Sequence, residues 1–442
     1  MVRSLESLHE EYTARNPKSL AQWERSRATM PAGVIKGAYM RSPFPFYVDH
    51  SDGCRLTDID DNVVIDFGSH HSAMILGHTH PDVTAAVQGE IERGLGLGNP
   101  TDLEAEISEE LVCRFPSIDK VRFTNSGTES SLHAARLIRA KTGRPKIAKF
   151  EGAYHGSHDG LEHSISPPMD DAGPADSPAT VPANPGVAPT SEDLVVMLPY
   201  NDPESVELIL REHKDEVAGV FYDGKPGMLD VPDEFTHFVR DITAELGMYM
   251  VMDEVVSYRV GRAGYQGLAG VEPDLTIFGK IVGGGMPVGA FGGGNELMDL
   301  MDNSEGAPVL APSGTFSGNN FTLAAGLATI RALTDEVYDH LNSIGSRLAM
   351  KLGPVFDDAG VPNQVLAVGS VVNVYLTDKP ARDYRSFRNH DTALFERISL
   401  AVHLKGYSLG VPPMAMMLSS PMTNEDIDGL VDALGEALSE ED

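Results

Sequence analysis

The sequence predicts an α/β protein, with a large domain built on a mostly parallel sheet flanked by helices and a smaller α+β domain formed from both termini. Three observations lead to this prediction. From about residue 110 to residue 330, short β-rich runs alternate with helical patterns, as in βαβ units. Strand patterns precede this region, and a strand and an amphipathic helix follow it. With 442 residues, of which 41% are hydrophobic, the chain is long enough for a large domain and a smaller companion.

Within the large domain, Ser126–Thr142 has a helical pattern that Gly143 ends as a C-cap. A second helix is expected to start near Asn319 and to continue to about Leu348, because apolar residues recur there at three- and four-residue steps. Five runs are predicted to be strands: KVRFT (120–124), KIAKF (146–150), VAGVFY (217–222), YMVMDEV (249–255) and LTIFG (275–279).

The domain boundaries follow from these patterns. Residues 66–330 are expected to form the large domain and residues 331–442 the small C-terminal domain, which includes the alternating strand SVVNVYLTD (370–378) and the amphipathic end NEDIDGLVDALGEAL. Residues 1–65, which contain the pattern of a short antiparallel meander, are expected to pack with the small domain.

Residues 161–193 form a long segment that is rich in Pro, Ala, Ser and Asp and has no periodicity. Loops of this length inside a compact domain are usually lids or disordered segments. We therefore expect a mobile lid over the active site, and a passive surface insertion is the alternative.

The chain is strongly acidic, with 65 acidic and 34 basic residues and a formal net charge of −31. Such a surface repels nucleic acid and anionic membranes, so neither is expected as a partner. No run approaches the roughly 20 apolar residues of a membrane span, and the N-terminus has no apolar signal region, so a cytoplasmic location is expected. A high-salt cytoplasm would explain the acidity, and an acidic protein from an ordinary organism is the alternative.

Neither cysteine nor histidine predicts a metal site. Cys54 and Cys113 lie in segments with a core-facing pattern, so both are expected to be reduced and buried thiols. His78 and His80 lie in the turn LGHTHP with no third ligand nearby. We therefore expect no bound metal.

Two strand ends present groups that bind phosphate and aromatic rings. Ser126, Gly127 and Thr128 follow strand 120–124 and begin a helix, where unpaired N–H groups, two hydroxyls and the helix dipole favour a phosphate. The same residues are also good N-caps. Tyr154 lies beyond strand 146–150 among small residues, where its ring can stack on a planar ligand or close the edge of the core.

Asp253 and Lys280 complete a set suited to pyridoxal phosphate. Asp253 follows four apolar residues at a strand end, where a buried carboxylate requires a cationic or hydrogen-bonding partner such as a pyridinium N–H. Val255 is placed to pack beneath the same ring. Lys280 ends the next strand and is followed by the glycine-rich run IVGGGMPVGAFGG, so it is the expected amine for a Schiff base with the cofactor and the base for the substrate Cα proton.

With these residues in place, the chain resembles the class III (fold type I) pyridoxal-phosphate aminotransferases, in the branch of glutamate-1-semialdehyde aminomutase and the β-amino-acid aminotransferases. The resemblance runs from about residue 25 to the C-terminus. Its motifs, in the order of the family, are MILGHTHP, RFTNSGTES, IAKFEGAYHG, MDEVV, PDLTIFGKIVGGGMPVGAFGG and SGTFSGNN.

The resemblance implies a homodimer with shared active sites. In such an enzyme, Thr315 of SGTFSG reaches the phosphate of the neighbouring subunit. The resemblance also implies a role for each cofactor residue. Lys280 bonds the cofactor, Asp253 pairs with the pyridinium, Val255 and Tyr154 enclose the ring, and the phosphate is held by Ser126, Gly127 and Thr128.

The substrate is less well defined. Where the family carries Glu-Pro, this chain has FYDGKPGM with Asp223, and a carboxylate expected near PPMAMM (412–417) for the aminomutase substrate is missing. The N-terminal part is more similar to β-amino-acid aminotransferases, which bind the substrate carboxylate with an N-terminal arginine. Arg41 is the nearest candidate, Lys36 lies near the matching position, and Arg259 suits bidentate carboxylate binding; each is alternatively a solvated surface charge.

Three functions are compatible with these patterns. The first is an aminotransferase that moves an amino group from an amino acid or amine to a keto acid or aldehyde by ping-pong chemistry. The second is an isomerase, an aminomutase or an amino-acid racemase, which the Pro-rich segment 161–193 favours because it resembles the aminomutase gating loop. The third is a non-catalytic protein on the same scaffold.

Overall fold

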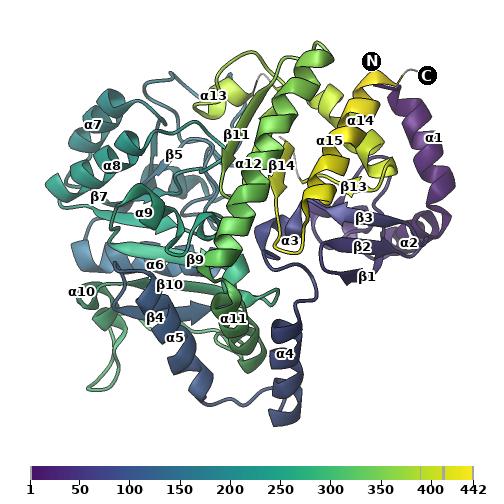
Figure 1. Ribbon diagram of the computed structural model, residues 1–442. Helices are drawn as coiled ribbons and strands as arrows, with labels where there is room; N and C mark the ends of the chain where they lie inside the picture. The colour runs from purple at the N-terminus through teal and green to yellow at the C-terminus, as the bar shows by residue number, and fades with distance from the viewer. Residues whose placement is uncertain (1, 389, 411–413, 441–442) are drawn as a thin grey trace. The chain divides into compact units, whose positions relative to one another are not determined.

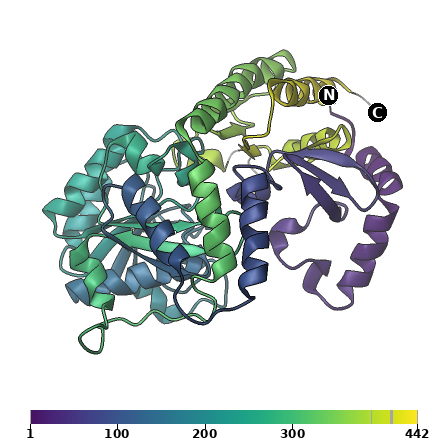
Figure 2. The ribbon, with the colours of Figure 1, turned by 60° about the horizontal axis from the view of Figure 1, so that its bottom comes forward.

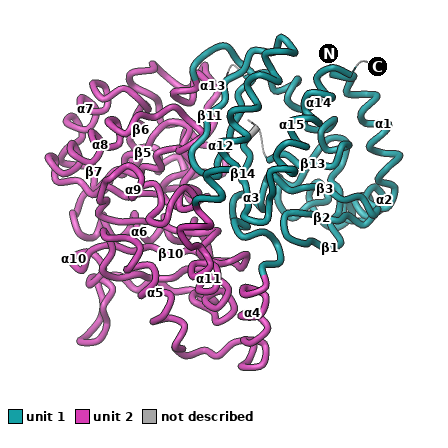
Figure 3. Tube along the Cα trace, in the orientation of Figure 1, with its two compact units in different colours: residues 1–80, 339–380, 389–442 teal, residues 81–338, 381–388 magenta. Residues whose placement is uncertain are grey.

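A computed structural model describes residues 2–388, 390–410 and 414–440 (Figure 1). The chain divides into two compact units (Figure 3). Unit 1 consists of residues 1–80, 339–380 and 389–442, and unit 2 consists of residues 81–338 and 381–388. The assignment of 1–65, 66–330 and 331–442 to folding domains stays a prediction.

Unit 2 contains a seven-stranded sheet with the strand order β4-β10-β9-β8-β7-β5-β6. All neighbouring pairs are parallel except those of β10, which is antiparallel to both β4 and β9, so the predicted mostly parallel sheet is confirmed. The strands are β4 (Lys120–Thr124), β5 (Lys146–Phe150), β6 (Val195–Leu198), β7 (Val217–Tyr222), β8 (Tyr249–Asp253), β9 (Leu275–Gly279) and β10 (Gly289–Gly293).

Helices cover the sheet of unit 2 on both faces (Figures 1 and 2). The helices are α4 (Pro81–Arg93), α5 (Asp102–Arg114), α6 (Gly127–Thr142), α7 (Pro203–Glu212), α8 (Asp233–Glu245), α9 (Gly264–Ala269), α10 (Asn295–Met298), α11 (Asn320–Ala332) and α13 (Tyr384–Phe387). Helix α6 packs against β4, β7, β9 and β10, while α5 contacts β4 and α8 contacts β8. Strands β7 and β9 are buried along their whole length, because a parallel sheet with helices on both faces leaves neither strand face in water.

Unit 1 has two small sheets. The first has the order β1-β2-β3-β13, in which β1 to β3 form the expected antiparallel meander and β13 pairs in parallel with β3. Its strands are β1 (Val48–Asp52), β2 (Arg55–Asp58), β3 (Val63–Asp66) and β13 (Tyr407–Ser408). The second is antiparallel and consists of β11 (Gln364–Val368), β12 (Val371–Tyr375) and β14 (Met414–Met417).

The helices of unit 1 come from both ends of the chain. They are α1 (Leu5–Arg15), α2 (Pro17–Arg27), α3 (Ser69–Ser72), α14 (Thr392–Leu404) and α15 (Asn424–Ser439), together with α12 (Asp335–Asp358), which continues from the end of unit 2. Helix α15 confirms the amphipathic helix expected at the C-terminus, and a capping box at Thr423 begins it. In the described part of the chain, no helix is long and apolar enough to cross a membrane.

The structure corrects three expectations. The single helix expected from Asn319 to Leu348 is two helices, α11 and α12, because the Thr334 hydroxyl accepts a hydrogen bond from the Val337 amide and so begins a new helix. The strand expected over 249–255 ends at Asp253. Cys113 is exposed on α5, whereas Cys54 is buried as expected.

Candidate functional site

The carboxyl ends of the parallel strands bring the predicted cofactor residues to one edge of the sheet in unit 2. Ser126 follows β4, Tyr154 follows β5, Asp253 ends β8 and Lys280 follows β9. Strands β8 and β9 are direct neighbours, with Asp253 opposite Ile277. Ligands of open parallel sheets bind at this edge, so the arrangement forms a candidate active site.

The N-terminus of α6 is open to an anion. The Ser126 hydroxyl accepts a hydrogen bond of 3.2 Å from the Glu129 amide and so caps the helix. Among the described residues, no acceptor is found for the main-chain N–H groups of Gly127 and Thr128. Because α6 has 16 residues, its dipole adds positive potential at the same point.

Three segments come close together beside this helix. A Cβ atom placed on Gly279 would lie 3.4 Å from Cγ1 of Val255 and 3.6 Å from Cα of Gly127, so the end of β9 lies against both. Lys280 follows Gly279 with a φ of 50°, in the left-handed region that a lysine rarely adopts. Strained backbone of this kind clusters at functional sites.

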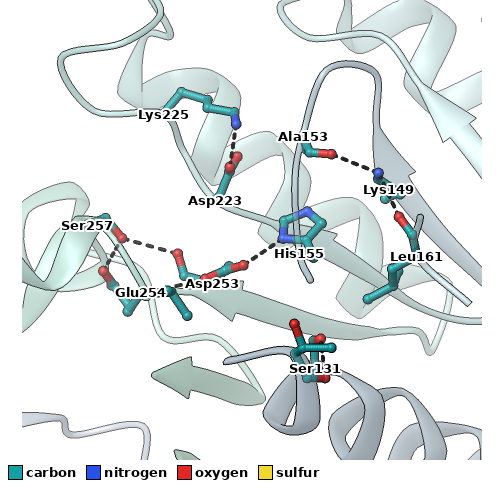
Figure 4. A network of polar contacts seen from close by, with 12 residues as sticks. Ser131, Lys149, Ala153, His155, Leu161, Asp223, Lys225, Asp253, Glu254 and Ser257 are labelled. Atoms are coloured by element: carbon teal, nitrogen blue, oxygen red, sulfur yellow. Dashed lines mark hydrogen bonds and ion pairs between the residues drawn. The ribbon is translucent and has the colours of Figure 1, made fainter. Parts of the chain in front are cut away.

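The buried carboxylate of Asp253 is held by two hydrogen bonds, and Figure 4 shows the one with His155. Its Oδ2 lies 2.7 Å from Nδ1 of His155, and its Oδ1 accepts a hydrogen bond of 2.9 Å from the Val255 amide. An ionised carboxylate only accepts, so Nδ1 of His155 is the donor. His155 was not predicted from the sequence, although its position beside Tyr154 in AYHG, after a strand, was a usable signal.

Glu254 fixes the turn that follows Asp253. Its fully buried carboxylate accepts hydrogen bonds from the Ser257 hydroxyl and from the amides of Tyr265 (3.0 Å) and Gln266 (2.8 Å). Burial raises the pKa of Glu254, although these hydrogen bonds act in the opposite direction. Glu254 therefore has a structural role and supports the backbone next to Asp253.

The segment FYDGKPGM, which differs from the Glu-Pro of the family, places a cluster of buried polar side chains at the end of β7. Asp223 accepts a hydrogen bond from the Tyr200 hydroxyl and forms an ion pair of 2.8 Å with Nζ of Lys225 (Figure 4). Burial alone would raise the pKa of Asp223, but Lys225, His155 and Tyr200 together lower it. The carboxylate is thus charged and neutralised by a lysine from the same loop.

Tyr154 lies in a loop that rests on the N-terminus of α6. The residue is 53% exposed in the single chain, and its hydroxyl lies 3.0 Å from the Ser157 hydroxyl. The Ser157 amide donates a hydrogen bond of 3.2 Å to Oγ1 of Thr128. Gly156 has a φ of 105°, and a Cβ atom there would lie 2.7 Å from Cα of Thr128, so only glycine fits this contact.

The three candidates for binding the substrate carboxylate differ in their surroundings. In unit 1, the partly buried Arg41 donates a hydrogen bond of 3.0 Å to Oγ of Ser408, and no carboxylate of the described residues lies within ion-pair distance of it. Lys36 is exposed and lies over the ring of Tyr39. Arg259 in unit 2 is 0% exposed, so its alternative assignment as a solvated surface charge is wrong.

Other predicted site residues were also located. Thr315 is exposed in the single chain, within a loop whose Ser317 hydroxyl accepts a hydrogen bond of 3.2 Å from the Asn125 side chain. His78 lies 3.0 Å from the Asp66 carboxylate. No group of three or more His, Cys, Asp or Glu residues suited to a metal occurs among the described residues. The start of PPMAMM, at residues 412 and 413, lies outside them.

Comparison with known proteins agrees with this geometry. The chain is 38% identical over 399 residues to the glutamate-1-semialdehyde 2,1-aminomutase of Heliobacterium modesticaldum, which covers 89% of each chain. Among solved structures, an omega-transaminase from Sphaerobacter thermophilus is 36% identical with a TM-score of 0.91, covering 96% of this chain and 98% of that chain.

Two more solved structures are similar. A transaminase with bound pyridoxal phosphate is 32% identical with a TM-score of 0.88, covering 96% of this chain and 97% of that chain. A β-phenylalanine aminotransferase from Variovorax paradoxus is 31% identical with a TM-score of 0.87, covering 98% of this chain and 96% of that chain. The family model for aminotransferase class III matches residues 37–438. The chain therefore belongs to the class III aminotransferases, the pyridoxal-phosphate-dependent family that its sequence resembles.

Proposed function

We propose that the protein is a pyridoxal-phosphate-dependent aminotransferase that moves an amino group from an amino acid or amine to a keto acid or aldehyde. The observation that carries this proposal is the placement of Asp253 and Lys280 at the ends of the neighbouring parallel strands β8 and β9. A buried carboxylate and an amine, at the ends of two neighbouring strands, are the two groups that the chemistry requires.

The described residues fit the cofactor at each of its parts. The amides of Gly127 and Thr128, with the hydroxyls of Ser126 and Thr128, suit the phosphate. A carboxylate in its ionised form only accepts hydrogen bonds, so Asp253 suits a protonated ring nitrogen. Gly279 has no side chain, so Val255 and the start of α6 lie close together beside the end of β9.

The chain's own groups then have separate tasks. Bound pyridoxal phosphate supplies an aldehyde that takes up the substrate amine and a ring that accepts electrons. Lys280 would hold the cofactor through its amine, and the same amine would move the proton at the substrate Cα. Asp253 keeps the proton on the ring nitrogen, and His155 holds Asp253 in place. Val255 and Tyr154 would enclose the cofactor ring.

Arg41 is the proposed binding group for the substrate carboxylate. Its guanidinium has one described hydrogen bond, to Ser408, and lies 5.1 Å from the centre of the Phe46 ring. Burial lowers the pKa of Arg41, which reflects how little water surrounds it. A desolvated arginine with unused N–H donors suits a bidentate carboxylate.

The enzyme is proposed to act as a homodimer. Thr315 and the neighbouring Phe316, which is 70% exposed, lie in a loop whose family counterpart contributes to the site of a second subunit. An exposed hydroxyl and an exposed aromatic ring in one loop suit a buried position in a dimer.

An isomerase of the aminomutase type is the second candidate. It is supported by the curated relatives, which include aminomutases 34–38% identical to the chain. An aminomutase moves the amino group within one molecule, and a racemase inverts the configuration of the carbon that carries it. Neither enzyme needs a second substrate. The true substrate of such an isomerase would give product in the absence of any keto acid.

A donor screen distinguishes the two functions. Purified protein with bound cofactor is mixed with single amino donors, including β-amino acids, without any acceptor. An aminotransferase loses the visible absorption of the bound cofactor and releases one keto product per site. An isomerase instead forms an isomeric amine in many turnovers, which would overturn the proposal.

A further inference from the structure

Lys149 is a fully buried lysine whose charge is satisfied by main-chain carbonyls alone. It lies on β5 and is 0% exposed. Its Nζ donates hydrogen bonds to the carbonyl oxygens of Ala153 (2.8 Å), Leu161 (3.0 Å) and His163 (2.6 Å). An ammonium group has three N–H donors, and each has its own acceptor here.

The three carbonyls belong to one segment, residues 153–163, which carries Tyr154 and His155. The carbonyls of Ala153 and Leu161 come from opposite ends of this short segment and accept from the same nitrogen atom (Figure 4). The base of the segment is also closed by a hydrogen bond of 2.8 Å from the Gly152 amide to the Ser164 carbonyl. Lys149 therefore closes this segment from the inside, and we call it the Lys149 loop.

Keeping an ammonium group at this place is unfavourable by itself. Burial, together with the nearby charge of Lys225, lowers the pKa of Lys149 to about 7, while Asp223 and Glu162 act in the opposite direction. An apolar side chain on β5 would avoid the desolvation. The same side chain would leave three buried carbonyls without their donor. Lys149 therefore serves to fix the backbone conformation of the Lys149 loop.

The shape matters because the Lys149 loop makes two contacts with the candidate site. His155 donates to Asp253 over 2.7 Å, and the Ser157 amide donates to Thr128 over 3.2 Å. Both contacts require the loop backbone to stay in one place. The group that holds that backbone thus acts on Asp253 and on the phosphate end without touching either.

We propose that Lys149 is a positioning residue, which holds the Lys149 loop so that His155 and Tyr154 are preset for the cofactor. This inference rests on the proposed function for its catalytic consequence. The loop-holding part of it concerns the chain alone. The two parts can therefore be tested separately.

The test compares Lys149→Met with wild type and with Lys146→Met as a matched control. Lys146 lies on the same strand, but its ammonium forms a more exposed ion pair of 2.9 Å with Glu216. Backbone hydrogen exchange of the purified full chain is followed by mass spectrometry. We expect peptides from 151–165 to exchange roughly 10-fold faster in K149M, with peptides from β8 and β9 unchanged and K146M equal to wild type.

Kinetics then test the link to the site. K149M should lower kcat for the amino donor by up to about 100-fold, because small misplacement of catalytic groups is sufficient for such a loss. Its KM should change little and its thermal midpoint should stay within a few degrees of that of K146M. If the wild-type protein shows no cofactor absorption, the proposed function is refuted. The hydrogen-exchange comparison would still test whether Lys149 holds the loop.

The proposal is overturned if the Lys149 loop exchanges in K149M as it does in wild type, even if activity is lost. It is also overturned if exchange rises equally throughout unit 2, since Lys149 would then support the fold in general. If K149M does not fold, Lys149→Gln replaces it. This variant keeps two donors on a shorter chain, and the same local acceleration, or its absence, decides the question.

Discussion

The Nδ1 atom of His155 donates a hydrogen bond of 2.7 Å to the Oδ2 atom of Asp253, and both side chains are buried. The two residues come from the loop after β5 and from the end of β8. Since Oδ1 of Asp253 is held by the Val255 amide, both oxygens of this carboxylate are oriented. The relationship gives Asp253 one defined position from which to bind a ring nitrogen.

Replacing His155 tests this orientation. His155→Leu removes the hydrogen bond to the Asp253 carboxylate. A hydrogen bond to an ionised group contributes about 1.5–3 kcal/mol, so kcat/KM should fall roughly 10- to 100-fold. His155→Asn, whose amide can still donate, should lose less. Steady-state kinetics and equilibrium dialysis of the cofactor measure both effects. Wild-type kinetics and cofactor affinity in His155→Leu would contradict the assigned role.

Arg41 is predicted to recognise the carboxylate of the amino donor. Arg41→Gln should raise KM about 10- to 100-fold for amino-acid donors, which corresponds to the loss of a charge-assisted pair. Amines without a carboxylate should react with the variant as with wild type. Lys36→Gln serves as the control, because Lys36 is exposed. Equal loss with both classes of donor would remove Arg41 from substrate recognition.

Acid should destabilise the protein through His403 in α14. Burial and the nearby Arg41 lower the pKa of His403 to about 3, whereas an unfolded chain has a histidine pKa of about 6.5. Between these values the unfolded state binds a proton that the folded state does not. The stabilisation is therefore complete above pH about 6.5 and is lost as pH falls toward 3, by up to about 1.4 kcal/mol per pH unit.

The measurement is the free energy of unfolding in urea at pH 7 and at pH 5. His403→Phe should reduce the loss on acidification by about 2 kcal/mol, because a phenylalanine ring can replace the imidazole among Tyr12 and Phe46 without binding a proton. His237→Phe, at an exposed position of α8, is the control. If the free energy of unfolding falls between pH 7 and pH 5 as much in His403→Phe as in wild type, the assignment to His403 is contradicted.

Salt should stabilise the folded chain. A formal net charge of −31 produces repulsion that an ionic strength of 0.1–1 M screens over distances of about 10 to 3 Å. The thermal midpoint should rise by several degrees from low salt to molar KCl. A chain that unfolds at low salt would fit a high-salt cytoplasm, and an unchanged or falling midpoint would contradict the repulsion argument.

Strong local patterns made much of the fold predictable. Strands β4, β5, β7 and β9 have the bounds of the predicted runs, because each is a short segment rich in β-branched and aromatic residues. Strand β10 was not predicted, since its sequence GAFGG is glycine-rich and lacks the β-branched residues of a typical strand. Its place between β4 and β9 results from tertiary packing, which requires small residues against Ser126 and Thr124.

The candidate site was predictable where function depends on position at a strand end. Asp253 and Lys280 were identified from the strand that precedes each of them. The partners of these residues were not, because His155 lies 98 residues from Asp253 and only the sheet order β8-β7-β5 brings the two together. The same is true of Asp223 and Tyr200, which follow β7 and β6 and meet only through the sheet order β7-β5-β6.

One measurement tests the central claim most directly, namely the absorption of the cofactor-loaded protein while a reactive amino donor is added without acceptor. Wild type should lose its visible band and release one equivalent of keto product per chain. Lys280→Ala, prepared in the same way, should show neither the wild-type band nor product. If Lys280→Ala keeps both the band and turnover, Lys280 is not the amine that binds the cofactor, and the account is wrong.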